Sequence, residues 1–294
     1  GNLYMISGKL DLALSEFRKA LALNAESVEA LLGLAETYQS DNKPSLAEQA
    51  YLEAIKLQPN YWRSYTQMGA FLFSAGRYSE AIPYYERISQ LMPDNSEAFN
   101  GLGASYYMLG DFGPAAVAMQ RSLDLEPSAI SYSNAGTSLF YLGRFDEAID
   151  MYMKAVEYAP EDFHWWGYLG DSYKFSTQGK ELAEPMYKNA IKLAADRLKV
   201  NPADAPTMGL LAHYHASVGN REEALQYIAR ANALAPADVY VHYNSATAYC
   251  ALGEVDKAAA ALRRAISMGF TKKLVVVDAN LCSLVDMPEF KPEL

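Results

Sequence analysis

The sequence predicts an all-α fold, an elongated solenoid of about eight stacked helix-turn-helix repeats, from three features that share one period. Eight alanines stand at successive separations of 34, 34, 34, 33, 35, 41 and 34 residues. A glycine or asparagine precedes seven of them by five residues, and a proline follows five of them by twelve. Such a period is typical of a chain that stacks one small unit, so core and binding surface should repeat with it. The alanines are Ala13, Ala47, Ala81, Ala115, Ala148, Ala183, Ala224 and Ala258.

Each repeat is predicted to turn in its middle and to end at its proline. We number the repeat so that the alanine is position 20. Position 15 then carries glycine or asparagine, which tolerate the left-handed backbone that ends a helix. A proline at position 32 stops the second helix before the next repeat begins. The position-15 residues are Gly8, Asn42, Gly76, Gly110, Gly143, Gly219 and Gly253, and the prolines are Pro59, Pro93, Pro127, Pro160 and Pro236.

Small and large residues occupy fixed places in the repeat and predict its core. Position 8 is glycine or alanine in all eight repeats, for example Gly69 and Ala35. Together with the alanine at position 20, it allows the two helices of a repeat to approach closely. Positions 11 and 24 carry mostly large residues such as Tyr38 and Tyr51, which should fill the adjacent space at the density of a protein interior.

The period divides the chain into eight repeats, the first of them truncated, and a tail. The predicted repeats are 1–27, 28–61, 62–95, 96–128, 129–162, 163–204, 205–238 and 239–272, followed by a C-terminal capping segment at 273–294. The tail carries Leu274, Leu281 and Phe290, among other apolar residues, at near-helical spacing. We expect it to cover the last apolar face of the stack, because solenoids need a terminal cap.

One repeat shows the full pattern. Positions 4, 7, 8, 11, 20, 24, 27 and 32 of residues 62–95 are Tyr65, Met68, Gly69, Leu72, Ala81, Tyr85, Ile88 and Pro93. This set resembles the tetratricopeptide repeat family, and the resemblance covers residues 1–272. It implies a right-handed superhelix in which the first helices line a concave groove that holds a protein or peptide partner.

The sixth repeat departs from the period. Residues 183–200 keep helical apolar spacing beyond the point where other repeats end, so about two extra turns, roughly 10 Å, are expected to project from the stack. The extension is either a length variant or an edge that docks a neighbouring domain or a second copy. Pro83 and Pro185 lie two residues after the alanines of their repeats, where a mild kink is expected.

The long sixth repeat and the tail DANLCSLVDMPEF at 278–290 are similar to the C-terminal repeat regions of bacterial multidomain signalling regulators. Those include serine/threonine kinases of eukaryotic type, winged-helix regulators and adenylate cyclases. The resemblance implies that this chain is the interaction part of a larger regulator.

Composition argues against several classes of partner and compartment. The 25 basic and 35 acidic residues give a formal charge of −10, whereas nucleic acids and anionic membranes attract clustered cations. We therefore expect neither as a partner. No apolar run is long enough for a membrane span, which favours a cytoplasmic location, or a periplasmic one if a span precedes this segment. Cys250 and Cys282 lie in apolar helical segments, and their spacing does not require a disulfide.

The sequence lacks a motif for catalysis, for a metal or for a cofactor. His213 and His215 are two residues apart, which points them to different faces of a helix, so we interpret both as structural. Turns and helix packing account for the glycines without a phosphate loop. We therefore expect no catalytic residue, no metal, no cofactor and no enzyme.

The resemblance places positions 2, 5, 6, 9, 12 and 13 of each first helix along the groove. Amides there can pair with the backbone of an extended peptide, and aromatic rings can hold its side chains. Each amide could instead decorate a solvated helix, and each ring could belong to the core. The candidate partner-binding residues are Gln67, Phe73, Asn100, Tyr107, Asn134, Thr137, Phe140, Tyr141, Tyr168 and Asn244.

These observations favour a non-catalytic scaffold that binds an extended peptide. Position 5 carries no basic residue from Leu32 onward, which argues against a clamp for a terminal carboxylate. Glu29, Glu36 and Glu97 favour a peptide with basic or neutral residues. The alternatives are an oligomerisation arm, which would make the protein a homo-oligomer, and a small-molecule-sensing module.

Overall fold

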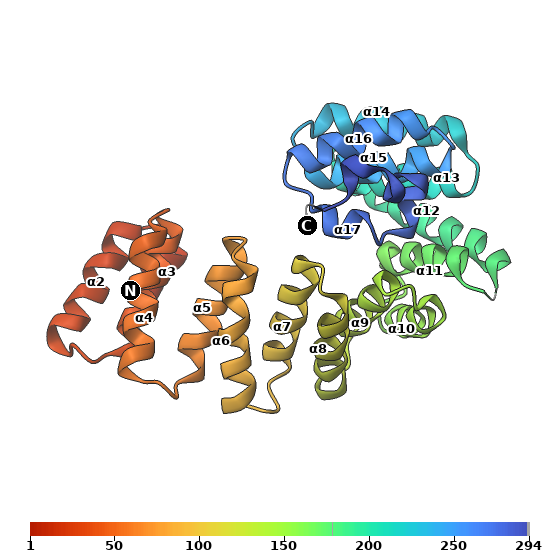
Figure 1. The fold of residues 1–294 in the computed structure, drawn as a ribbon. Coiled ribbons are helices and arrows are strands. Elements are labelled where there is room, and N and C mark those ends of the chain that lie inside the picture. Colours follow the sequence, from red (N-terminus) through yellow and green to blue (C-terminus); the bar gives the residue numbers. More distant parts are fainter. Residues whose placement is uncertain (178, 293–294) are drawn as a thin grey trace. The chain divides into compact units, whose positions relative to one another are not determined.

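The computed structural model describes residues 1–177 and 179–292, and within these ranges it consists of helices and turns without a strand (Figure 1). The predicted all-α fold of helix-turn-helix pairs is confirmed. The chain forms two compact units, an N-terminal unit, Gly1–Leu125, and a C-terminal unit, Glu126–Leu294.

The N-terminal unit is built from consecutive helices that pair through short turns (Figure 1). Each repeat contributes a first helix and a second helix, and successive first helices also contact each other. The helices are α1 (Asn2–Ile6), α2 (Leu10–Leu23), α3 (Val28–Ser40), α4 (Pro44–Leu57), α5 (Trp62–Ser74), α6 (Tyr78–Leu91), α7 (Ser96–Leu109) and α8 (Phe112–Leu125).

The C-terminal unit continues the same pairing and ends in short helical turns. Its paired helices are α9 (Ala129–Tyr141), α10 (Phe145–Tyr158), α11 (Phe163–Phe175), α12 (Ala183–Val200), α13 (Ala205–Ser217), α14 (Arg221–Leu234), α15 (Val239–Ala251) and α16 (Val255–Ser267). A 3-10 turn, η1 (Lys180–Leu182), precedes α12. The tail forms α17 (Lys272–Val275), η2 (Ala279–Asp286) and η3 (Pro288–Phe290).

The predicted turn residues have the backbone conformation expected of them. All seven position-15 residues have positive φ, between 54° at Asn42 and 81° at Gly219. Each position-32 proline stands two residues beyond the last residue of a second helix; Pro59, for example, follows α4, which ends at Leu57. The glycine and proline pattern therefore predicted the helix ends correctly.

The repeated alanines lie at the closest helix contacts. Seven of the eight are 0% exposed, and Ala183 is 8% exposed. The position-8 glycines face the large position-24 residues: a Cβ atom added to Gly170 would lie 2.6 Å from Cε1 of Tyr187. Such a separation is too short for a carbon–carbon contact, so the ring occupies the space that the glycine leaves.

Helix α12 is extended, but the extension does not stand free of the unit. It ends 17 residues after Ala183 (200 − 183), whereas α10 ends 10 residues after Ala148 (158 − 148). The seven additional residues agree with the predicted two turns of about 10 Å. However, Ala194 and Leu198 are buried in one cluster with residues of α13, so the expected projection is wrong for all but the tip. The apolar side chains of the extension are therefore buried within the C-terminal unit.

The kink expected at Pro185 is also wrong. Helix α12 begins at Ala183, which makes Pro185 its third residue, where a backbone N–H has no intrahelical acceptor to lose. The preceding turn is the separate segment η1, so the proline lies nearer the helix start than its repeat position suggested. Pro83, by contrast, lies inside α6.

The tail packs on the last repeat of the C-terminal unit. Leu281, Leu284 and Phe290 are buried, and η2 packs against α15 and α16, where Figure 1 shows the dark-blue end of the chain. A disulfide joins Cys250 of α15 to Cys282 of η2, with 5.7 Å between the two Cα atoms. The sequence spacing gave no reason to expect this bond.

Candidate functional site

The predicted binding residues of the N-terminal unit lie on two neighbouring first helices. Gln67 and Phe73 belong to α5, and Asn100 and Tyr107 belong to α7. Gln67 Nε2 donates a hydrogen bond to Oε1 of Glu36 on α3. We call these five residues the N-terminal first-helix face, because they come from the first helices of three successive repeats.

Glu36 is the acidic residue of this face, and it also lines a hollow on the surface. The hollow is lined by Met5, Ile6, Glu36, Gln39 and Ser40. Burial raises the pKa of Glu36, while the hydrogen bond from Gln67 acts in the opposite direction. A carboxyl group that is half-buried and has one amide partner can accept a further hydrogen bond from a cationic or neutral donor.

The two rings of the face are held edge-on by neighbouring rings. The Phe73 centroid lies 5.1 Å from that of Tyr78, and the Tyr107 centroid lies 5.7 Å from that of Phe112. Both Phe73 and Tyr107 are half-buried. Each ring therefore belongs in part to the core, as the alternative interpretation allowed, and in part to the surface.

The candidates of the C-terminal unit differ widely in burial. Phe140 is 7% exposed, and its centroid lies 5.2 Å from that of Phe145, so it is mainly a core residue. Asn244 is 8% exposed and packs on Gly209, where an added Cβ would lie 3.2 Å from its Nδ2. These two residues therefore present little surface to a partner. Asn134 and Tyr141 are half-buried.

Thr137 and Tyr168 converge on the side chain of Tyr152. Thr137 Oγ1 lies 2.9 Å from the Tyr152 hydroxyl oxygen, and the Tyr168 centroid lies 5.3 Å from that of Tyr152. Burial, aided by the negative charge of Asp171, raises the pKa of Tyr168 to about 12. The Tyr168 hydroxyl is therefore neutral at physiological pH and can donate a hydrogen bond.

A buried polar network connects three helices of the C-terminal unit. Asp171 Oδ1 on α11 accepts hydrogen bonds from the Tyr187 hydroxyl at 2.7 Å and from His213 Nε2 at 2.8 Å. Burial acts to raise the pKa of Asp171, but His213, Lys174 and Tyr187 outweigh it, and the pKa is lowered. The interpretation of His213 as a structural histidine agrees with this network. The sequence contained a signal for this pair, because Asp171 and His213 both occupy position 9 and therefore correspond to each other in successive repeats.

The tail brings a second buried carboxylate to the same helices. Asp278 is 1% exposed and accepts hydrogen bonds from the Tyr243 hydroxyl and, at 2.9 Å, from the backbone N–H of Asn280. Lys174 Nζ donates to Asn280 Oδ1 at 3.5 Å. Burial raises the pKa of Asp278, since the hydrogen bonds only partly offset the loss of solvent. The repeat pattern contained no signal for this contact, because the tail lies outside the period.

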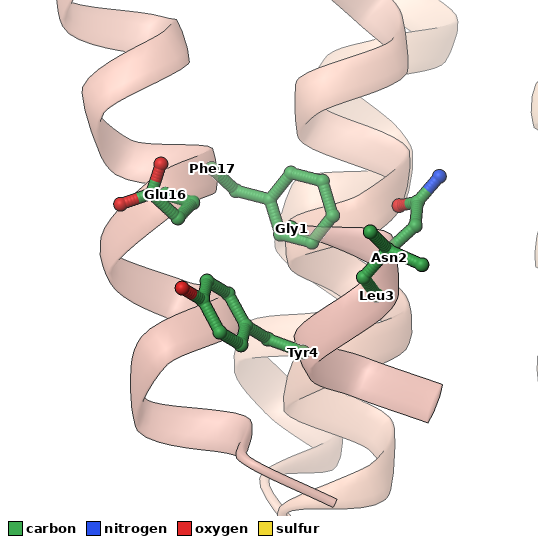
Figure 2. Close-up of a pocket in the computed structure, with 6 residues that line it drawn as sticks. All are labelled: Gly1, Asn2, Leu3, Tyr4, Glu16 and Phe17. Atoms are coloured by element: carbon green, nitrogen blue, oxygen red, sulfur yellow. The ribbon is translucent and has the colours of Figure 1, made fainter. Parts of the chain in front are cut away.

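A further pocket lies at the first residues of the N-terminal unit. Figure 2 shows its lining, which is Gly1, Asn2, Leu3, Tyr4, Glu16 and Phe17. Its one carboxylate, Glu16, accepts a hydrogen bond from Lys19 Nζ at 2.8 Å. None of these residues is a predicted binding residue.

The part of the chain that the structure describes holds neither a cluster of metal-ligand side chains nor a helix suited to span a membrane. Residues 1–177 and 179–292 contain no group of three or more His, Cys, Asp or Glu side chains that could hold a metal ion. Over the same part of the chain, no helix combines the length and the apolar character needed to cross a membrane.

Family models match most of the chain. Models described as "Tetratricopeptide repeat" match residues 28–61, 63–128, 129–162 and 210–269, and a model described as "TPR repeat" matches residues 1–42. Together these matches cover residues 1–61, 63–162 and 210–269, which is more than half of the chain.

Individual relatives resemble the chain at low identity. Protein CTR9 homolog of Arabidopsis thaliana is 25% identical over 296 residues, which cover 87% of this chain and 26% of that protein. The solved structure of a tetratricopeptide repeat protein from Parabacteroides merdae has a TM-score of 0.64 at 17% identity, covering 87% of this chain and 97% of that one. The structure of YrrB, described as a TPR protein with an unusual peptide-binding site, has a TM-score of 0.55 at 23% identity, covering 62% and 94%. The two structural likenesses show the fold.

The chain spans only part of the first curated relatives that it matches. It covers 26% of the CTR9 homolog and 26% of RNA polymerase II-associated protein 3 of Mus musculus. The type IV pilus assembly protein PilF of Pseudomonas aeruginosa is covered over 57% of its length.

Proposed function

Because the chain belongs to the tetratricopeptide repeat family, we propose that it is a non-catalytic scaffold whose N-terminal first-helix face binds an extended segment of a partner protein. The observation that carries the proposal is the succession of Glu36, Gln67 and Asn100 on α3, α5 and α7. One N–H of Gln67 donates to Glu36 and its Oε1 is buried. Glu36, Asn100 and the second N–H of Gln67 are the groups that can pair with the backbone of an extended chain, which has no partners of its own. Phe73 and Tyr107 flank the row and supply apolar contact.

The charge of these helices favours a partner with basic or neutral polar side chains. Helices α3, α5 and α7 carry three glutamates, Glu29, Glu36 and Glu97, against one arginine, Arg63. Such complementarity acts on the association rate and on the choice of partner more than on total affinity. The name Hsp70-Hsp90 organizing protein 2, borne by an Arabidopsis thaliana relative that is 23% identical over 163 residues, agrees with a role in assembling proteins.

Selection of peptides from a random 12-residue library against the whole chain provides the test. Calorimetry then compares the best peptide on wild type, Gln67→Ala and Asn100→Ala, with Gln120→Ala on α8 as a matched control for amide loss. Loss of one well-placed hydrogen bond corresponds to about a tenfold weaker Kd. We expect that loss for Gln67→Ala and Asn100→Ala and none for Gln120→Ala.

Two results would contradict the proposal. One is equal affinity for all four proteins, which would place the peptide elsewhere. The other is selection of no peptide together with self-association in sedimentation, which would favour the oligomerisation arm and a homo-oligomer.

We further propose that the scaffold works inside a larger regulatory protein. The extended α12 and the tail at 278–290 carry the resemblance to bacterial signalling regulators, and the chain spans only part of the relatives it matches. The Cys250–Cys282 disulfide favours an oxidising compartment such as the periplasm over the cytoplasm. Sequencing the complete gene tests the first statement, and thiol labelling in whole cells tests the second.

A further inference from the structure

Three first-helix residues of the C-terminal unit contact the tail at positions where a partner would be expected. Lys174 is at position 12 of its repeat, Tyr243 at position 5 and Cys250 at position 12. Lys174 donates to Asn280, Tyr243 donates to Asp278, and Cys250 is bonded to Cys282. We call Lys174, Tyr243 and Cys250 the C-terminal first-helix face.

The tail meets this face with polar groups at its start and apolar groups further on. Asp278 and Asn280 engage Tyr243 and Lys174, and Ala279 packs on the cluster that contains Leu139 and Leu169. Leu281 follows, and its side chain is buried. The residues that follow Asp278 form the 3-10 helix η2, so this face holds a short helical turn through a carboxylate, an amide and apolar side chains.

Capping alone does not account for Asp278. The cap requires apolar surface, which Leu281, Leu284 and Phe290 provide. A buried carboxylate is costly unless it is paired and hydrogen-bonded. Oδ1 of Asp278 caps the start of η2 by accepting from the backbone N–H of Asn280, whereas Oδ2 accepts from the hydroxyl of Tyr243 on α15, which the capping of η2 does not require. Lys174 is the only lysine or arginine on α9, α11, α13 and α15, and it is the residue that lies beside Asn280 and near Asp278. The contact therefore places the one cation of these helices beside the polar start of the tail.

We propose that residues 278–282 are an intramolecular ligand, which occupies a binding site on the C-terminal first-helix face for partner segments that carry a carboxylate side chain, and that the Cys250–Cys282 disulfide keeps this site closed. The inference rests on the proposed function in one respect, namely that first-helix faces of this fold bind polypeptide segments. It adds a second site whose partner is acidic, unlike the partner of the N-terminal first-helix face.

Opening of the site follows from reduction of the disulfide by a dithiol. Two electrons and two protons pass from the dithiol to the protein, the Sγ–Sγ bond breaks, Cys250 and Cys282 become thiols, and the dithiol becomes a cyclic disulfide. The tail is then held by non-covalent contacts only, and an acidic segment can compete with it. While the disulfide is intact, the tail remains at a very high effective concentration and excludes a competitor.

The test uses the tail sequence itself as a probe. A fluorescent peptide of residues 271–290 with serine in place of Cys282 is titrated with the full chain, and anisotropy reports binding. The proteins are oxidised wild type, wild type reduced with dithiothreitol, and the double variant Cys250→Ser/Cys282→Ser. We expect at least about tenfold tighter binding to the second and third proteins than to the first.

Matched substitutions locate the bound probe. In the cysteine-free background, Asp278→Ala in the chain should strengthen probe binding, because it weakens the competing tail. Lys174→Met should weaken it, and Lys192→Met, an exposed residue of α12, should not change it. A probe with Asp278→Asn should bind about tenfold more weakly than the original.

Equal binding to oxidised and reduced wild type would overturn the inference, and so would absence of binding to the reduced protein and to the cysteine-free Asp278→Ala protein. The comparison of oxidised with reduced wild type requires no substitution, so it tests the inference even if one of the variants fails to fold. The residues tested here are distinct from Gln67 and Asn100, so failure of the proposed function at the N-terminal first-helix face is recognised separately.

Discussion

Asp171 and His213, 42 residues apart in the chain, are joined by a hydrogen bond of 2.8 Å between Oδ1 and Nε2. The same carboxylate oxygen accepts from Tyr187, so one side chain connects α11, α12 and α13. All three partners are buried. A polar group in such a position stabilises the unit only while its partners remain in place, because each orphaned group would stay desolvated.

Replacing Asp171 with alanine should therefore destabilise the C-terminal unit. The hydroxyl of Tyr187 and Nε2 of His213 would lose their acceptor inside the core, at a cost of about 3 kcal/mol in the free energy of unfolding. Urea unfolding followed by the fluorescence of Trp165 and Trp166 measures this in a Trp62→Phe background. Asp150→Ala, at an exposed site on α10, is the control. A loss no larger than that of the control would show that the network is not stabilising.

The same carboxyl group predicts a pH dependence. Its pKa is lowered in the folded protein, so its contribution to stability is complete above the unfolded-state pKa of about 3.9 and is lost as pH falls below that value towards the folded-state pKa. The difference in unfolding free energy between wild type and Asp171→Asn should shrink over that acidic window. If this difference in unfolding free energy stayed constant from pH 5 down to the pH at which the protein unfolds, the pKa of Asp171 would not be lowered in the folded protein.

Asp278 should show the opposite sign. Its pKa is raised in the folded protein by burial, so the ionised form is penalised above the folded-state pKa. As pH falls from that value to about 3.9, the folded protein takes up the proton more readily than the unfolded chain and gains stability. Relative to Asp278→Asn, wild type should therefore become more stable across this window, as measured by urea unfolding at a series of pH values.

Substitutions at two glycines of the N-terminal unit distinguish the effect of close packing on stability from the effect of helix propensity. A Cβ on Gly101 would overlap the ring of Tyr85, whereas a Cβ on Gly113 would meet no heavy atom within 4 Å. Gly101→Ala should cost about 1–3 kcal/mol through overpacking, and Gly113→Ala, inside α8, should be neutral or stabilise by up to about 1 kcal/mol. Trp62 fluorescence during urea unfolding reports both, in a Trp165→Phe/Trp166→Phe background. Equal effects would mean that the ring of Tyr85 moves aside freely.

The extension of α12 should contribute to stability more than to assembly. Leu198 is buried in a cluster with residues of α13, whereas Val200 at the tip is 89% exposed. Leu198→Ala should cost about 2–5 kcal/mol, the range for a buried leucine, while Val200→Ala should leave the thermal midpoint nearly unchanged. If Leu198→Ala were as mild as Val200→Ala, the extension would be a free edge after all.

The periodic part of the fold was predictable because the same repeat positions make the same helix contacts and turns in each repeat. Ala148 and Gly143 could be assigned to a helix contact and a turn from the sequence alone, since a close helix contact requires a small residue and a left-handed turn favours glycine. The burial of Asn244 was less accessible to this reasoning, because it depends on the absence of a side chain at Gly209 in the preceding repeat.

The tail could not be placed by the same logic. Lys174 and Asn280 are 106 residues apart, and the tail has no second copy whose spacing could reveal its partner. Apolar spacing predicted that the tail would cover the last repeat, as Leu281 and Leu284 do. It did not predict that Asp278 would contact the first helices, because the sequence pattern of an apolar segment does not distinguish a buried carboxylate from one that faces solvent.

A crystal structure of the full chain bound to a library-selected 12-residue peptide would show directly which helices hold the partner segment. We expect an extended peptide along α3, α5 and α7, with its backbone within hydrogen-bonding distance of Gln67 and Asn100. A peptide bound instead to the second helices α4, α6 and α8, with Gln67 and Asn100 uncontacted, would contradict the proposed function.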